Sequence, residues 1–129
     1  MRFWEEHRPA AVALDIETIS LDERHPVGIG IAFSPEEAFY FQLTPEVSEK
    51  GLEALKKFTS DIRIVKIAHN WVFDMGVFPL IPVIGKSLDR ANLFDTNVAA
   101  RLLGYQETAL SILCYEVNMQ TTGMGDILK

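Results

Sequence analysis

The chain has 129 residues, 48% of them hydrophobic and 23% charged, a composition that fits one compact domain with a sizeable core. Residues 1–8 lack the apolar centre of a signal peptide, and no apolar run approaches the ~20 residues of a membrane span, so we expect a cytoplasmic protein without membrane contact. The net charge of −6 argues against strong unassisted binding to nucleic acid, because phosphate contacts come mostly from Lys and Arg.

The first third of the chain has the pattern of an antiparallel meander. Three segments alternate or run apolar as strands do: residues 11–16, 27–33 and 37–43. Ser34, Pro35 and Glu36 predict a tight turn between the second and third strands.

A helix and a returning strand are expected next. Pro45 opens a helical pattern that runs to about Thr59, and residues 63–68 then form a strand. A strand–helix–strand connection is right-handed and places its second strand parallel to the first. The meander and the parallel strand together predict an α/β fold, with a mixed sheet flanked by helices.

The second half of the chain is expected to be mainly helical. Asn70 is predicted to cap a helix that carries Asp74 one turn in, and Trp71 beside it is predicted to be a surface or hinge anchor. Three residues break the chain after this helix: Pro79, Pro82 and Gly85. Two further helices are expected near residues 96–104 and 108–116.

Two residues of this half have more specific expectations. Asp95, with Thr96, is expected to cap the helix that begins at Asn97, and a metal-binding role for Asp95 is the alternative. The single cysteine, Cys114, lies in an apolar helical pattern, so it is predicted to be a buried free thiol without a disulfide or zinc role.

Two carboxylates, Asp15 and Glu17, follow the first apolar run. Side chains two residues apart in a strand share a face. Two acids held this close repel each other unless a cation lies between them, and Mg²⁺ prefers carboxylate oxygens. The alternative is an exposed acidic turn at a strand end.

A third acid, Asp74, has helical spacing that places it on the side of Asn70, beside the stripe that faces the core. A carboxylate in that position is costly unless it has a partner. It is either a third ligand or a satisfied helix acid, with His69 before the helix an ordinary loop histidine.

The pattern Asp15-x-Glu17 followed by His69-Asn70-x-x-Phe73-Asp74 resembles the first two motifs of the DnaQ-like (DEDD) 3′-to-5′ exonuclease superfamily. It is most similar to the proofreading domains of family A DNA polymerases, and the similarity spans roughly residues 10–118. The resemblance implies a ribonuclease H-like fold. It also implies phosphodiester hydrolysis with two Mg²⁺ or Mn²⁺ ions at the 3′ end of single-stranded DNA.

The resemblance further assigns roles to single residues. Asp15 would bridge both metal ions, Glu17 would hold the ion that carries the attacking water, and Asp74 would hold the second ion. Four residues match substrate-binding positions: Thr18, Leu21, Asn70 and Phe73. Three of these have structural alternatives, since Leu21 could be core, Asn70 only a helix cap, and Phe73 a core residue instead of a stacking platform for a base.

The family's fourth carboxylate, in a Tyr-x-x-x-Asp or His-x-x-x-Asp motif, has no match. Four residues after Tyr115 stands Met119, and four residues before Asp126 stands Thr122. We therefore expect residues 1–129 to be one exonuclease domain that is truncated at its C-terminus and lacks the third motif.

Such a domain would belong to a longer bacterial or viral protein with a polymerase domain as partner, and alone it would be weak or inactive. Alternatives are an RNase D-like exoribonuclease, a catalytically inactive docking domain, or an unrelated α/β binding module.

Overall fold

The structure, a computed structural model, describes residues 10–46, 49–81, 84–85, 87–88 and 92–119. The expectations for residues 1–8, Pro82, Thr122 and Asp126 lie outside these residues. Contacts along the chain divide it into two units, Met1–Asp95 and Thr96–Lys129, which are described separately. No helix in the described ranges has the length and apolar character needed to cross a membrane.

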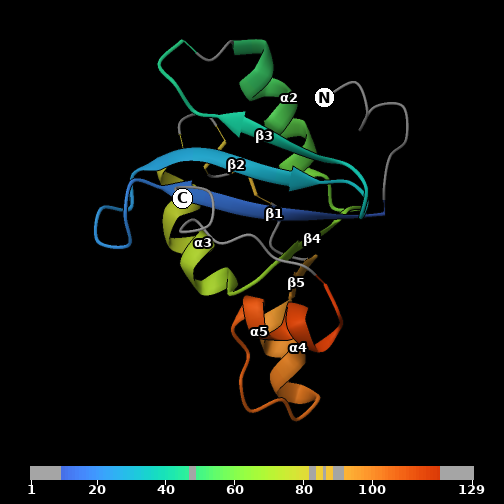
Figure 1. The fold of residues 1–129 in the computed structure, drawn as a ribbon. Helices are drawn as coiled ribbons and strands as arrows, with labels where there is room; N and C mark the ends of the chain where they lie inside the picture. Colours follow the sequence, from blue (N-terminus) through green and yellow to red (C-terminus); the bar gives the residue numbers. More distant parts are fainter. Residues whose placement is uncertain (1–9, 47–48, 82–83, 86, 89–91, 120–129) are drawn as a thin grey trace. The chain divides into compact units, whose positions relative to one another are not determined.

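A five-stranded sheet with the order β3-β2-β1-β4-β5 is the framework of the first unit (Figure 1). Its strands are β1 (Ala11–Thr18), β2 (Pro26–Ala32), β3 (Ala38–Gln42), β4 (Val65–Ala68) and β5 (Leu93–Asp95). The first three strands pair antiparallel, while β4 is parallel to β1 and β5 is parallel to β4. The predicted mixed α/β sheet is thus confirmed. Strand β5 was not predicted, because three residues are too few to show alternation.

Two helices of the first unit follow the predicted order. Helix α2 (Glu49–Ser60) connects β3 to β4, and α3 (Trp71–Val77) continues into the short 3₁₀ helix η1 (Phe78–Leu80). Helix α2 begins later than expected, because Pro45 and Glu46 form a turn before it. Pro79 lies within η1, where its missing N–H is tolerated in the first turn.

The second unit contains two short helices, α4 (Thr96–Leu102) and α5 (Leu110–Glu116). Both lie where helices were expected, but each is shorter than predicted. Gly104 follows α4 with a φ of 92°, a left-handed conformation that glycine adopts without strain after a helix end. Cys114 in α5 is a free thiol but is only half-buried.

The two faces of the sheet in the first unit differ in character. The core-facing side carries buried apolar residues that pack with Leu55 and Phe58 of α2: Val12, Leu14, Ile16, Ile29 and Ile31. Each buried side chain of this size contributes about 1.5–3 kcal/mol relative to exposure. Alternation places Asp15 and Glu17 on the opposite face. A slip of one residue would turn both acids into the core, so burial fixes their orientation.

Candidate active site

Asp15 and Glu17 lie next to small residues of the neighbouring strand. In the register of β1 and β2, Asp15 stands opposite Gly30 and Glu17 opposite Gly28. A Cβ atom on Gly28 would lie 2.0 Å from the phenol oxygen of Tyr40, so the Tyr40 ring from β3 crosses over Gly28 on the same face as the acids. The Tyr40 ring therefore occupies the space over Gly28, beside Glu17.

The two carboxylates interact directly. Burial, the negative charge of Asp15 and a hydrogen bond with the Asp15 side chain together raise the pKa of Glu17. The closeness of two like charges on one strand face thus adds to burial in disfavouring the ionised form of Glu17.

Asp74 reaches the same end of β1 from helix α3. Its Oδ1 atom accepts a hydrogen bond of 3.2 Å from the backbone N–H of Ile16, the residue between Asp15 and Glu17. The pairing of β1 with β4 extends from Ala11 to Ala13. The hydrogen bond from Ile16 to Asp74 therefore lies beyond the end of that pairing. The structure therefore brings together the three acids that the sequence predicted.

Asp74 is buried, with only 4% of its surface exposed, and this burial is the main cause of its raised pKa. Burial raises the pKa of Asp74 to about 6, and the negative charges of Asp15 and Asp95 add to this, while the hydrogen bond from Ile16 acts in the opposite direction. The Asp74 carboxyl is therefore largely protonated in mildly acidic solution.

The donor set suits a hard divalent cation in its chemistry. Carboxylates are the preferred ligands of Mg²⁺, and mutual repulsion among acids is what a bound cation relieves. Among the described residues, however, no three His, Cys, Asp or Glu side chains are arranged to hold a metal ion. The side chains of Asp15 and Glu17 point to each other, and Asp74 points to Ile16. The predicted pair of ions stays a prediction.

Helix α3, which carries Asp74, is capped by a residue of strand β5. The two carboxylate oxygens of Asp95, at the end of β5, accept hydrogen bonds of 2.9 Å each from the backbone N–H groups of Asn70 and Trp71. Asp95 thus caps α3, a role that was not predicted, while its predicted role as a cap of the helix that follows it stays a prediction. An acid after a short strand could have suggested such a cap only if β5 had been recognised.

Asn70 is the N-cap residue directly before α3, but its side chain makes no capping hydrogen bond. Its backbone is left-handed, with φ 72° and ψ 64°, a conformation that asparagine adopts more readily than most residues. Asn70 therefore occupies the predicted N-cap position, but its side chain does not cap the helix. Its side chain is exposed and not engaged in holding the helix.

Trp71 corrects another expectation. It is buried at 6% exposure, and its indole Nε1 donates a 3.0 Å hydrogen bond to the carbonyl of Phe94. It was predicted to be a surface or hinge anchor. Instead, it joins α3 to β5 inside the first unit.

The other predicted substrate-binding residues lie around this end of β1. The Thr18 hydroxyl donates a 2.9 Å hydrogen bond to the carbonyl of Ser20. Leu21 is 79% exposed, which rules out the core alternative for this residue. Phe73 is half-buried against the core, and the guanidinium of Arg24 lies 5.4 Å from its ring centre. Arg24 had not been singled out in the sequence, since a lone arginine in an acidic loop has no recognisable pattern.

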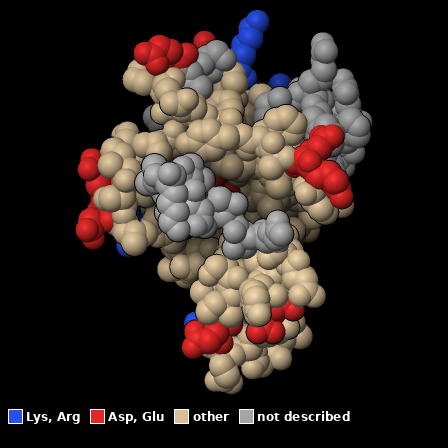
Figure 2. All heavy atoms as spheres, viewed as in Figure 1, with Lys and Arg blue, Asp and Glu red and all other residues tan. Residues whose placement is uncertain are grey.

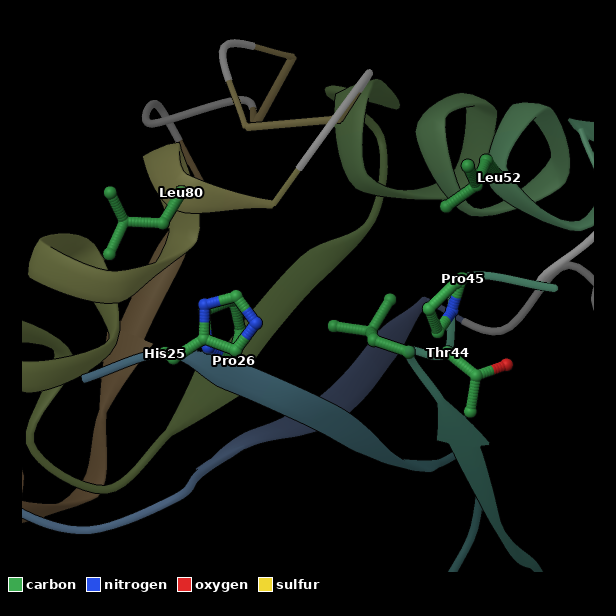
Figure 3. Close-up of a pocket in the computed structure, with 7 residues that line it drawn as sticks. His25, Pro26, Thr44, Pro45, Leu52 and Leu80 are labelled. Atoms are coloured by element: carbon green, nitrogen blue, oxygen red, sulfur yellow. The ribbon is translucent and has the colours of Figure 1, made fainter. Parts of the chain in front are cut away.

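A pocket of about 340 Å³ lies in the first unit but contains none of the three acids. It is formed near the ends of β2 and β3, α2 and η1 (Figure 3) and is lined by His25, Pro26, Leu43, Thr44, Pro45, Leu52 and Leu80. This lining is mostly apolar, with His25 as its titratable group. The pocket therefore has no carboxylate in its lining and is separate from the three acids.

Comparison with known protein families identifies the family to which the chain belongs. Residues 2–128 match the pattern of the 3′-5′ exonuclease family. The chain belongs to this family. A comparison with curated protein sequences finds no match.

Solved structures of three other proteins have the same fold. Brucella melitensis NrnC superposes with a TM-score of 0.77 at 22% identity, over 94% of this chain and 58% of NrnC. Escherichia coli RNase D, an exoribonuclease involved in structured RNA processing, gives 0.64 at 21% identity, over 89% of this chain and 30% of RNase D. The catalytic core of RRP6 from Trypanosoma brucei gives 0.68 at 17% identity, over 95% of this chain and 33% of that chain. The chain thus spans less than two thirds of each of these proteins.

Proposed function

We propose that this chain is the part of a metal-dependent 3′-5′ exonuclease that carries three of its catalytic acids. Asp74 is bound to the Ile16 amide between Asp15 and Glu17, and this observation carries the proposal. Three acids from two elements meet at one strand end in a chain of the 3′-5′ exonuclease family. The reaction is hydrolysis of the terminal phosphodiester of a single strand, with release of nucleotides.

Asp15, Glu17 and Asp74 would hold the divalent ions, Mg²⁺ or Mn²⁺. When bound, such ions stabilise negative charge on a phosphodiester and lower the pKa of water. A structure of Brucella melitensis NrnC with bound Mg²⁺ also superposes on this chain, with a TM-score of 0.74 over 95% of it, which supports magnesium as the ion. The chain's own part is to present the acids, with Ile16 holding the Asp74 carboxyl in place.

RNA is the substrate that we favour. RNase D, one of the similar structures, is an exoribonuclease by its description, and another similar structure is NrnC bound to pGG. The second candidate is proofreading of single-stranded DNA 3′ ends beside a polymerase domain. The similarity of residues 10–118 to the proofreading domains of family A polymerases supports it. Both candidates use the same acids, because these contact phosphate and metal and not the 2′-hydroxyl.

Two exposed side chains would contact the terminal nucleotide. Leu21 is 79% exposed in the loop after β1 and would pack against the terminal base. Asn70 is exposed and has no capping role, so its amide would be available to hydrogen-bond the nucleotide. Thr18 and Phe73 would line the same place, although Phe73 also packs against the core.

Degradation of 3′-labelled single-stranded RNA and DNA of equal sequence, with Mg²⁺ or Mn²⁺, tests the proposal. We expect shortening from the 3′ end, faster on RNA, which falls at least about a hundredfold in Glu17→Gln because a metal ligand is lost. Glu36→Gln is the matched control, since Glu36 lies in the exposed turn between β2 and β3.

Faster cleavage of DNA would favour the proofreading candidate. A folded chain that neither cleaves a strand nor binds Mn²⁺ would instead support the inactive docking domain and contradict the proposal.

A further inference from the structure

The loop between β1 and β2 carries an arginine, Arg24, that reaches helix α3. Residues 19–25 form a compact loop, closed by hydrogen bonds from Ile19 N to the His25 carbonyl and from Ser20 N to the Glu23 carbonyl, both 3.2 Å. The Ser20 hydroxyl also accepts a 2.8 Å bond from Glu23 N. This loop begins directly after Thr18. Arg24 is therefore attached to a defined backbone near the end of β1 that carries Glu17.

The Arg24 side chain extends from this loop to helix α3. Its guanidinium lies 5.4 Å from the ring centre of Phe73, and its Nη1 atom is 3.5 Å from the position of a Cβ on Gly76. Phe73 and Gly76 are one helical turn apart, and Phe73 precedes Asp74. Stacking on Phe73 uses one face of the guanidinium and leaves N–H groups at its edge available for hydrogen bonds.

The other Lys and Arg side chains that the structure describes in the first unit are engaged or lie on other elements. Arg63 forms an ion pair of 2.7 Å with Asp61, and Lys66 is fully buried and donates to the Asp61 carbonyl. Three lysines lie on α2: Lys50, Lys56 and Lys57. In the described part of the chain Arg24 has no ion-pair partner, and it is the one exposed Lys or Arg that contacts α3 from the loop after β1.

The negative net charge of the chain makes an exposed arginine such as Arg24 important for binding an anion. The chain has a net charge of −6, and the face drawn in Figure 2 shows more surface from Asp and Glu than from Lys and Arg. A nucleic-acid strand is repelled by such a surface unless local cations contact its phosphates. A guanidinium binds a phosphate with two parallel N–H···O bonds, which makes arginine well suited to that contact.

We propose that Arg24 binds a backbone phosphate of the nucleic-acid strand, next to the phosphate that the acids hold. The inference rests on the proposed function and extends it, because it names the residue that anchors the strand. Arg24 lies over Phe73 and Gly76 and not over Asp15, so it contacts a neighbouring phosphate and not the one that is cleaved. It therefore acts on substrate binding and not on the chemical step.

The test measures binding of 5′-labelled eight-nucleotide RNA and DNA strands by fluorescence anisotropy at several KCl concentrations, with Ca²⁺ in place of Mg²⁺. We expect Arg24→Gln to raise Kd about tenfold and to reduce the slope of log K against log salt by about 0.7, as for one lost phosphate contact on a single strand. Arg24→Lys should keep most of the slope with weaker binding. Arg63→Gln changes the net charge equally and should leave both quantities unchanged.

Three results would overturn the inference. If Arg24→Gln lowers the melting temperature but leaves the salt slope unchanged, Arg24 only attaches the loop to α3. If the unchanged chain binds and degrades the strands and Arg24→Gln does so equally well, this inference fails while the proposed function stands. If the unchanged chain neither binds nor degrades any strand, both fail together.

Discussion

The backbone N–H of Ile16 is the point at which the three acids are held together. It lies between Asp15 and Glu17 in sequence and donates to Asp74 from another element. This single bond offsets part of the cost of burying the Asp74 carboxyl, because hydrogen bonds to the charged form favour ionisation. The remaining cost is visible in the pKa values of Asp74 and Glu17, which are both raised.

The raised pKa of Asp74 predicts how stability depends on pH in the metal-free chain. The folded pKa of about 6 exceeds the ordinary value of 3.8, so between these values the folded state holds a proton that the unfolded state has lost. Stability from this group is present below about pH 4 and is lost as pH rises through 6, by up to about 3 kcal/mol. Glu17 acts in the same direction. Urea unfolding in EDTA at pH 4, 5, 6 and 7 measures the effect.

Asp74→Asn is the control for this prediction. An asparagine oxygen still accepts a bond from Ile16 N but carries no charge, so the fall in stability between pH 4 and 7 should be much smaller. Asp61, whose pKa is lowered to about 2 by its hydrogen bond with Arg63, changes stability only at lower pH and does not interfere. A stability that rises from pH 4 to 7 equally in both proteins would contradict the prediction.

At the level of secondary structure, helix α3 is fixed by the strand that follows it in the chain. Both oxygens of Asp95 are bonded to its first N–H groups. Asp95→Ala should lower the free energy of unfolding by about 2 kcal/mol, since it removes a helix cap and a charge at the N-terminus. Urea unfolding with circular dichroism measures this loss. Asp61→Ala, another aspartate outside α3, should cost less, and an equal cost in both would contradict the capping role.

A substitution of Asn70 distinguishes a structural role of its side chain from a role in substrate binding. Asn70→Gly should not destabilise the chain and should stabilise it by up to about 1 kcal/mol, because glycine adopts the left-handed conformation without strain. If its amide binds the terminal nucleotide, the same change should raise the KM for a single strand severalfold. A loss of stability would mean that the Asn70 side chain supports α3 after all.

Alternation and order in the sequence were enough to predict most of these elements. Asp15 and Glu17 lie on one strand, so their shared face follows from a period of two. The parallel pairing of β4 followed from its helical connection. Strand β5 is held by pairing with β4 over only three residues, and the cap by Asp95 depends on it, so neither had a local signal. The exposure of Leu21 and the burial of Trp71 are set by tertiary contacts, so they also had no local signal in the sequence.

For the whole molecule, binding of a divalent cation should raise stability. A ligand present at 100 times its Kd adds about 2.7 kcal/mol when it binds only the folded state. We expect Mg²⁺ or Mn²⁺ at pH 7.5 to raise the melting temperature by several degrees, measured by differential scanning fluorimetry. The increase should be lost in Asp15→Asn and retained in Glu36→Gln. An equal increase in both variants would indicate nonspecific binding to an acidic chain.

The bond between Ile16 N–H and Asp74 also makes one backbone amide a reporter on the site. Neighbouring amides of β1 are protected from hydrogen exchange by pairing with other strands, whereas this proton is protected by a side chain of α3. Its exchange rate therefore follows undocking of α3, even while the sheet stays intact. Ile16 should exchange faster in Asp95→Ala than the amides on either side of it, and a ligand that settles Asp74 in place should slow it again.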